Sequence, residues 1–125
     1  MWREPGQLSS VLVVDDDPDI LEALDLTLSS CGYRPALFAS AEEFLGVAAT
    51  SQAACLVVDI QLGGISGVEL GRKLSASGFT FPIIFMTGSR DEQHRRQAME
   101  FGCIAFLLKP FPADRLIEAI TSAID

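Results

Sequence analysis

The chain has 125 residues, 49% of them hydrophobic and 21% charged, which is enough apolar material for one domain with a single core. Nine basic and seventeen acidic residues give a net charge of −8, which disfavours direct binding to nucleic acid or to an anionic membrane surface. No apolar run approaches the roughly 20 residues of a spanning helix, and the first ten residues lack the apolar core of a signal peptide. We therefore expect a cytoplasmic protein with a loose tail over residues 1–9 and one domain over residues 10–125.

Five short apolar runs alternate with longer segments of helical periodicity. The runs cover residues 11–14, 34–38, 55–58, 83–87 and 104–108. Four of them are continuously apolar, which is typical of parallel strands covered by helices on both faces. Pro35 interrupts the second run, and because proline cannot donate a ladder hydrogen bond, we expect this strand at a sheet edge. The pattern predicts an α/β fold with five helices and a doubly wound, flavodoxin-like parallel sheet of five strands in the order 2-1-3-4-5.

Signals for helix ends lie between these runs. Asp17 followed by Pro18 is typical of an N-cap and a first helical residue. Serines with a glutamate three residues later predict three more helix starts, at Ser40, Ser66 and Ser89. Glycines with positive φ are expected at three helix C-termini, at Gly32, Gly78 and Gly102.

The three cysteines are an odd number without the spacing of metal ligands. Cys31, Cys55 and Cys103 each have small or apolar neighbours. We expect all three to be buried and reduced rather than to have a redox role.

Polar residues follow four of the five runs. These residues are Asp15–Asp17 after the first run, Asp59 after the third, Thr87 at the end of the fourth and Lys109 after the fifth. Parallel strands end at one edge of a sheet, and ligands of such folds bind outside that edge. We therefore expect these side chains to converge in one cleft.

The chemistry of such a cleft favours a hard cation and phosphate. Clustered carboxylates repel one another, and a divalent ion bound by oxygen alone is typically Mg²⁺. Zinc and copper are disfavoured, because the single histidine, His94, lies on a predicted helix elsewhere. A lysine and a hydroxyl can bind phosphoryl oxygens, and an aspartate can act as nucleophile to form an aspartyl phosphate.

Each of these residues also has a purely structural interpretation. Asp17 is expected to be a helix cap, Asp59 could form a turn, Lys109 could be a surface lysine and Thr87 an ordinary strand residue. Capping explains at most one of the neighbouring Asp15 and Asp16. The coincidence of all these residues at one edge favours a functional cleft.

At these residues the chain resembles the receiver domain of bacterial two-component response regulators. The resemblance covers nearly all of residues 10–125 and rests on four motifs in order: VLVVDDDPDI, CLVVDIQLGGISG, PIIFMTG and FLLKPF. It implies a switch in which Asp59 accepts a phosphoryl group from a phosphohistidine of a sensor histidine kinase or phosphotransfer protein. It also implies an Mg²⁺ ion held by Asp16, Asp59 and the backbone carbonyl of Gln61, with Asp15 assisting through a metal-bound water.

The resemblance assigns further residues to binding and switching. Thr87 and Lys109 would bind the phosphoryl oxygens, and the Lys109–Pro110 peptide bond would be cis. Phe106 stands at the position of an aromatic switch residue. Phosphorylation would draw Thr87 inward and repack the face formed by the fourth helix, the fifth strand and the fifth helix, through which family members dimerise or contact an output. The output could be transcription, and the kinase would dock near the first helix, at Pro18 and Ile20.

Two positions depart from the family pattern. Gly63 stands where the family usually has proline, and this exchange should loosen the loop that carries the Gln61 carbonyl. On this ground, proline at position 63 is expected to tighten Mg²⁺ binding. Phe106 replaces the frequent tyrosine or histidine, so that any switching must rely on packing.

Three other classes share parts of this pattern. An aspartate-nucleophile phosphohydrolase would carry an Asp-x-Asp-x-Thr motif after its first strand, whereas Asp17 is followed here by Pro18 and Asp19. A flavodoxin-like electron carrier would need a hydroxyl-rich loop at the three aspartates. An unphosphorylated pseudo-receiver acting only as an interaction module is disfavoured by the complete set of acidic, hydroxyl and lysine residues.

Overall fold

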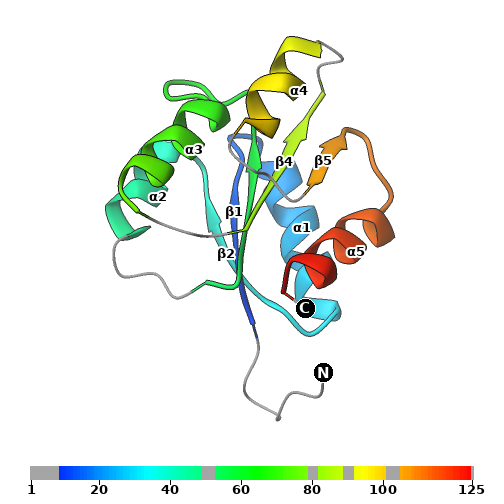
Figure 1. Cartoon of the computed structure of the whole chain (residues 1–125). Helices are drawn as coiled ribbons and strands as arrows, with labels where there is room; N and C mark the ends of the chain where they lie inside the picture. The colour runs from blue at the N-terminus through cyan, green and yellow to red at the C-terminus, as the bar shows by residue number, and fades with distance from the viewer. Residues whose placement is uncertain (1–8, 49–52, 79–81, 89–91, 101–104, 125) are drawn as a thin grey trace.

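A computed structural model describes residues 9–48, 53–78, 82–88, 92–100 and 105–124 of the chain. Strands and helices alternate throughout these residues (Figure 1). The elements in chain order are β1 (Ser10–Val14), α1 (Pro18–Ser30), β2 (Arg34–Phe38), α2 (Ala41–Ala48), β3 (Cys55–Asp59), α3 (Gly67–Ala76), β4 (Ile83–Thr87), α4 (Glu92–Met99), β5 (Ala105–Leu108) and α5 (Ala113–Ile124). No helix within the described ranges is long and apolar enough to cross a membrane.

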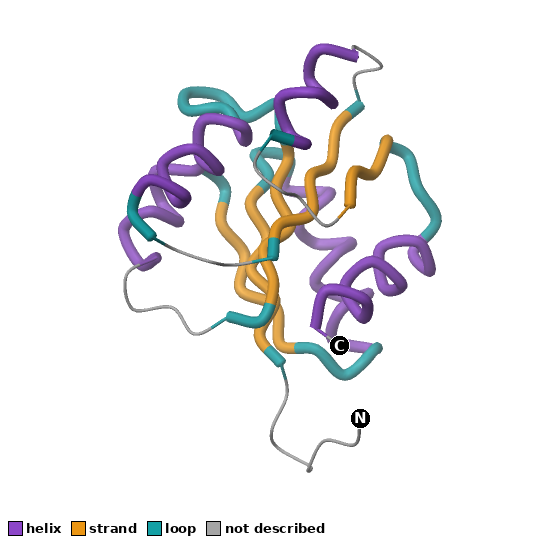
Figure 2. Tube along the Cα trace, in the orientation of Figure 1, coloured by secondary structure: helices purple, strands orange, loops and turns teal. Residues whose placement is uncertain are grey.

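The five strands form one parallel sheet in the order β2-β1-β3-β4-β5, which confirms the prediction. The strand that contains Pro35 lies at an edge, as the missing N–H of proline requires. Helices α1 and α5 cover one face of the sheet, and α2, α3 and α4 lie on the other (Figures 1 and 2).

Alternate residues of the central strands supply the two halves of the core. On β1, Leu12 and Val14 pack towards α2 and α3, whereas Val11 and Val13 pack towards α1 and α5. Because successive strand side chains point to opposite faces, a strand buried on both sides must be apolar at every position. This requirement explains the continuous apolar runs in the sequence.

The helix ends follow the predicted chemistry within the described residues. The Asp17 carboxylate accepts a hydrogen bond from the Asp19 N–H and caps α1, with Pro18 as its first residue. The hydroxyls of Ser40 and Ser66 each accept a hydrogen bond from the N–H of the glutamate three residues on, at 3.1 Å. Gly32 and Gly78 have positive φ after α1 and α3. The expectations for Ser89, Gly102, Cys103 and residues 1–8 lie outside the described residues.

One cysteine prediction is wrong. Cys31 is exposed, because it is the C-cap residue of α1 and lies beyond Leu28, the last buried residue of that helix. Cys55 is buried in β3, and burial raises the pKa of its thiol to about 12, which makes it unreactive at neutral pH.

Candidate functional site

The predicted polar residues meet at the carboxyl edge of the sheet. Asp59 and Thr87 are the last residues of β3 and β4, while Asp15 and Lys109 directly follow β1 and β5. Backbone hydrogen bonds continue the sheet past the strand ends: the Lys109 N–H donates to the Thr87 carbonyl at 2.7 Å, and the Asp15 N–H donates to the Phe38 carbonyl at 3.0 Å. The sheet itself therefore fixes the backbone of the site.

Lys109 joins two of the aspartates. Its ammonium donates to Asp15 Oδ2 and to Asp59 Oδ2, both at 2.8 Å. The Asp15 side chain is fully buried and that of Asp59 is 7% exposed, so this bridge lies in a region of low dielectric. The peptide bond between Lys109 and Pro110 is cis.

Burial and hydrogen bonding shift the pKa values of Asp15 and Lys109. Burial, together with the charge of Asp59, raises the pKa of Asp15, although the Lys109 hydrogen bond opposes this shift. Burial alone would lower the pKa of Lys109, but its hydrogen bonds to Asp15 and Asp59 outweigh this effect and raise it. The lysine is therefore held in its charged form, which the two carboxylates require.

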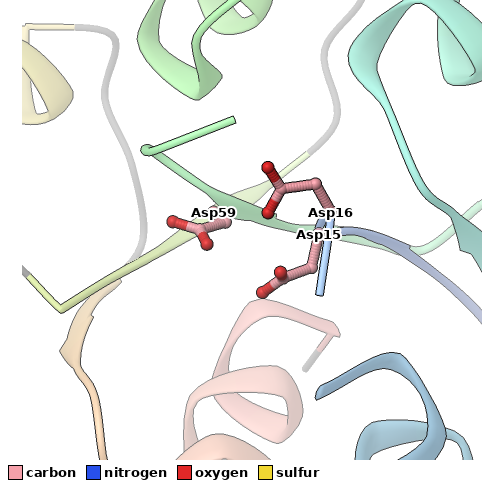
Figure 3. Close-up of side chains that lie close together, drawn as sticks. All are labelled: Asp15, Asp16 and Asp59. Atoms are coloured by element: carbon pink, nitrogen blue, oxygen red, sulfur yellow. The ribbon is translucent and has the colours of Figure 1, made fainter. Parts of the chain in front are cut away.

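Asp16 completes an acidic cluster with Asp15 and Asp59 (Figure 3). One carboxylate oxygen of each residue lies within 4.8 Å of the others. When ionised, the three carboxylates carry three negative charges and Lys109 one positive charge, which leaves two negative charges within the described site. An oxygen-only donor set with this imbalance fits a hard divalent cation such as Mg²⁺.

Backbone N–H groups also hold the carboxylates. The Asp17 N–H donates to Asp15 Oδ1 and the Gln61 N–H donates to Asp59 Oδ1, each at 2.9 Å. The Asp59 contact is the turn that the structural interpretation predicts, and it coexists with the Lys109 bridge. Asp59 is thus both a turn residue and a member of the cluster.

Thr87 is fully buried, and its hydroxyl donates to the side-chain oxygen of Gln61 at 3.2 Å. Phe106 is partly buried and packs against the core cluster on the α2 and α3 side of the sheet. Thr87 lies on β4 and Phe106 on β5, and these two strands are paired. Thr87 lies opposite Leu108, and Phe85 lies opposite Phe106. The two predicted switch residues therefore lie on adjacent strands.

Two contributors to the site were not predicted from the sequence. A Cβ atom at Gly67 would overlap the Asp59 carbonyl oxygen, so only glycine allows α3 to begin this close to the strand end. Glu42 at the start of α2 accepts a long hydrogen bond from the Ile65 N–H at 3.4 Å and so contacts the loop after Asp59. The sequence signal for Gly67 is a glycine directly after the cap residue Ser66. Nothing in the sequence indicates the contact of Glu42.

Known proteins share the sequence pattern and the fold of this chain. Residues 11–121 match the family of response regulator receiver domains. The chain is 38% identical to the transcriptional regulatory protein FixJ of Bradyrhizobium diazoefficiens over 91% of its own length, and 36% identical to the response regulator protein TmoT of Ectopseudomonas mendocina over 98%. It spans 56% of the first relative and 60% of the second.

Solved structures agree with this relationship. A crystal structure of FixJ-N has a TM-score of 0.88 at 35% identity, with 94% of both chains covered. A CheY-like receiver domain from Methanospirillum hungatei has a TM-score of 0.89 at 28% identity, with 95% of both covered. The chain belongs to the response regulator receiver domain family. Receiver domains of such regulators are signalling switches rather than conventional enzymes, which argues against the phosphohydrolase and electron-carrier alternatives.

The Lys109 bridge leads to a stability prediction. Lys109→Met should destabilise the protein by about 3 kcal/mol, because two buried carboxylates lose their cation. Urea unfolding without Mg²⁺ measures this change, and Asp15→Asn should recover part of it in the Lys109→Met background. The control is Arg72→Met, which removes an exposed 2.6 Å ion pair with Glu69 and should cost less than about 1 kcal/mol. Equal losses for the two methionine variants would contradict this account.

The close approach of Gly67 leads to a second prediction. Gly67→Ala should destabilise the protein by about 2 kcal/mol, since the added methyl group must displace the Asp59 carbonyl. Gly46→Ala, within α2, is the matched control because a Cβ there meets nothing within 4 Å. It should instead stabilise the fold by up to about 1 kcal/mol through helix propensity. A Gly67→Ala protein as stable as Gly46→Ala would refute the packing argument.

Proposed function

We propose that this chain is a phosphorylation switch in which Asp59 accepts a phosphoryl group from the phosphohistidine of a sensor histidine kinase or phosphotransfer protein. The observation that carries this proposal is the double hold on Asp59: Lys109 binds one carboxylate oxygen and the Gln61 N–H the other, each within 2.9 Å, beside Asp15 and Asp16. A carboxylate oriented in this way is a suitable nucleophile.

In the transfer, an Asp59 oxygen attacks phosphorus, the phosphorus–nitrogen bond of the donor breaks, and the imidazole leaves with the electron pair. Asp15, Asp16, Asp59 and the Gln61 carbonyl would hold Mg²⁺, which when bound supplies charge neutralisation for phosphoryl oxygens. Lys109 Nζ already lies 2.8 Å from Asp59 Oδ2. It would need only a small movement to donate to an oxygen of a phosphoryl group bound to Asp59.

The switch would follow from the donor that the phosphoryl group attracts on β4, the Thr87 hydroxyl. Thr87 would exchange its hydrogen bond with Gln61 for one with a phosphoryl oxygen, which draws its side chain towards Asp59. The partly buried Phe106 would then fill the vacated space. This repacking would change the face of α4, β5 and α5, through which the chain would act on an output domain or form a homodimer. The names of the relatives support transcription as the output.

The acceptor prediction is tested by intact-mass analysis. Wild-type protein with acetyl phosphate and Mg²⁺ should gain one phosphoryl group, while Asp59→Asn should gain none because an amide cannot act as the acceptor. Asp17→Asn is the matched control: it removes a neighbouring charge but keeps a good N-cap of α1, and it should be modified like the wild type. A wild-type protein that stays unmodified would instead identify the chain as a pseudo-receiver.

Kinase docking would use the apolar groove between α1 and α5. A cavity of about 330 Å³ lies beside Lys109 and Pro110, and its walls include Ile20, Ala23 and Phe111. It is lined mainly by apolar surface and ends at the lysine of the site, so a helix seated in it would lie next to Asp59. Of the predicted contact residues, Ile20 lines this groove.

The docking prediction is tested by one charge placed at two positions of α1. Ala23→Asp, inside the groove, should slow transfer from an autophosphorylated histidine kinase by about tenfold, a cost of about 1.4 kcal/mol. Leu26→Asp is the control, because Leu26 is 68% exposed and does not line the groove. Modification by acetyl phosphate, which needs no docking, should be unchanged in both. Equal kinase rates for the two variants would exclude this surface.

A further inference from the structure

Asp16 differs from the other two aspartates in how it is held. Asp15 and Asp59 are buried and bridged by Lys109, whereas Asp16 is exposed. Within the described part of the chain, its carboxylate has one hydrogen bond, in which Oδ2 accepts from the backbone N–H of Gly63 at 3.2 Å. The orientation of Asp16 therefore depends on the loop between β3 and α3.

Gly63 does not need the special backbone freedom of glycine. Its φ is not positive, unlike that of Gly64, and a Cβ atom at position 63 would make only an ordinary contact, 3.7 Å from Asp16 Oδ2. An alanine therefore fits, and it keeps the N–H donor. Proline lacks a backbone N–H and cannot make this hydrogen bond.

We propose that Gly63 is a positioning residue whose backbone N–H orients Asp16 towards the Mg²⁺ site, an inference that rests on the proposed function. A carboxylate has two oxygens, so Oδ2 can keep the N–H while Oδ1 remains available to a cation. Hydrogen bonds to metal-binding carboxylates fix their orientation and raise metal affinity. The hydrogen bond from Gly63 thus orders the Asp16 side chain before Mg²⁺ binds, so that less conformational entropy is lost on binding.

This inference reverses the expectation from loop composition. If glycine only loosens the loop, proline at position 63 tightens Mg²⁺ binding, and alanine does so to a smaller degree. If the N–H positions Asp16, proline weakens binding and alanine preserves it. The opposite signs make the two explanations separable by one measurement.

The deciding experiment is calorimetric titration of Mg²⁺ into the wild type, Gly63→Ala and Gly63→Pro. We expect Gly63→Ala to bind within about twofold of the wild type and Gly63→Pro to bind about tenfold more weakly. Equal affinities, or tighter binding by Gly63→Pro, would overturn the role of Gly63 while leaving the proposed function intact. A wild type that binds no Mg²⁺ would refute the metal site of the proposed function as well.

Glu42→Ala separates loop stiffness from the hydrogen bond to Asp16. This change removes the Glu42 contact with the Ile65 N–H but leaves Gly63 and Asp16 untouched. The Mg²⁺ affinity of Glu42→Ala should stay within about twofold of the wild type, since the charge-assisted hydrogen bond from Gly63 that orients Asp16 remains. A loss as large as that in Gly63→Pro would assign the effect to loop stiffness and overturn the inference.

The Gly63 amide resonance tests the inference even if Gly63→Pro fails to fold. In ¹H–¹⁵N spectra without metal, Asp16→Ala should move the Gly63 amide proton upfield, because its acceptor is lost. In the wild type, addition of Mg²⁺ should leave this proton on the downfield side, since the N–H and the cation use different oxygens. A shift on Mg²⁺ addition to the position seen in Asp16→Ala would overturn the inference.

Discussion

The bridge from Lys109 to Asp15 and Asp59 is the interaction on which the site depends. It joins the residue after β5 to residues at the ends of β1 and β3, which are separated by 94 and 50 positions in the chain. Two buried carboxylates this close are tolerable only because one ammonium lies 2.8 Å from both. The parallel sheet supplies the rigid frame for this arrangement, since all the strand ends that carry these groups lie at one edge.

The same bridge links stability to function. A cluster with more negative than positive charge is a cost to the folded state, and burial of Asp15 increases that cost. A ligand that brings positive charge to the cluster is favoured, because it relieves part of the repulsion between these carboxylates. In the proposed switch, Lys109 passes from neutralising carboxylates to neutralising a phosphoryl group. The fold thus keeps an excess of negative charge at the site where the proposed phosphoryl transfer requires a cation.

Apolar pattern and strand endings were sufficient to predict the fold and the composition of the cleft. Continuous apolar runs predict a sheet buried on both faces, and Pro35 predicts which strand lies at its edge. Convergence of Asp15, Asp59, Thr87 and Lys109 followed from parallel topology alone. Exposure of Cys31 is not predictable from its neighbours in sequence, because residue type does not reveal which way the side chain of a cap residue faces. The contact of Glu42 with the β3–α3 loop was also missed, since it depends on how α2 is placed beside that loop.

Backbone groups account for the remaining part of the site, and of their contacts the sequence predicts only the turn at Asp59. The N–H groups of Asp17, Gln61 and Gly63 each donate to one of the three carboxylates. The identity of the donor residue matters little for such a contact, provided that it is not proline. Substitution of the usual family proline by Gly63 therefore adds a donor as well as flexibility, and these two consequences act in opposite directions on Asp16. Sequence reasoning recognises the flexibility of glycine, but only the position of the N–H shows that the exchange also gives Asp16 a partner.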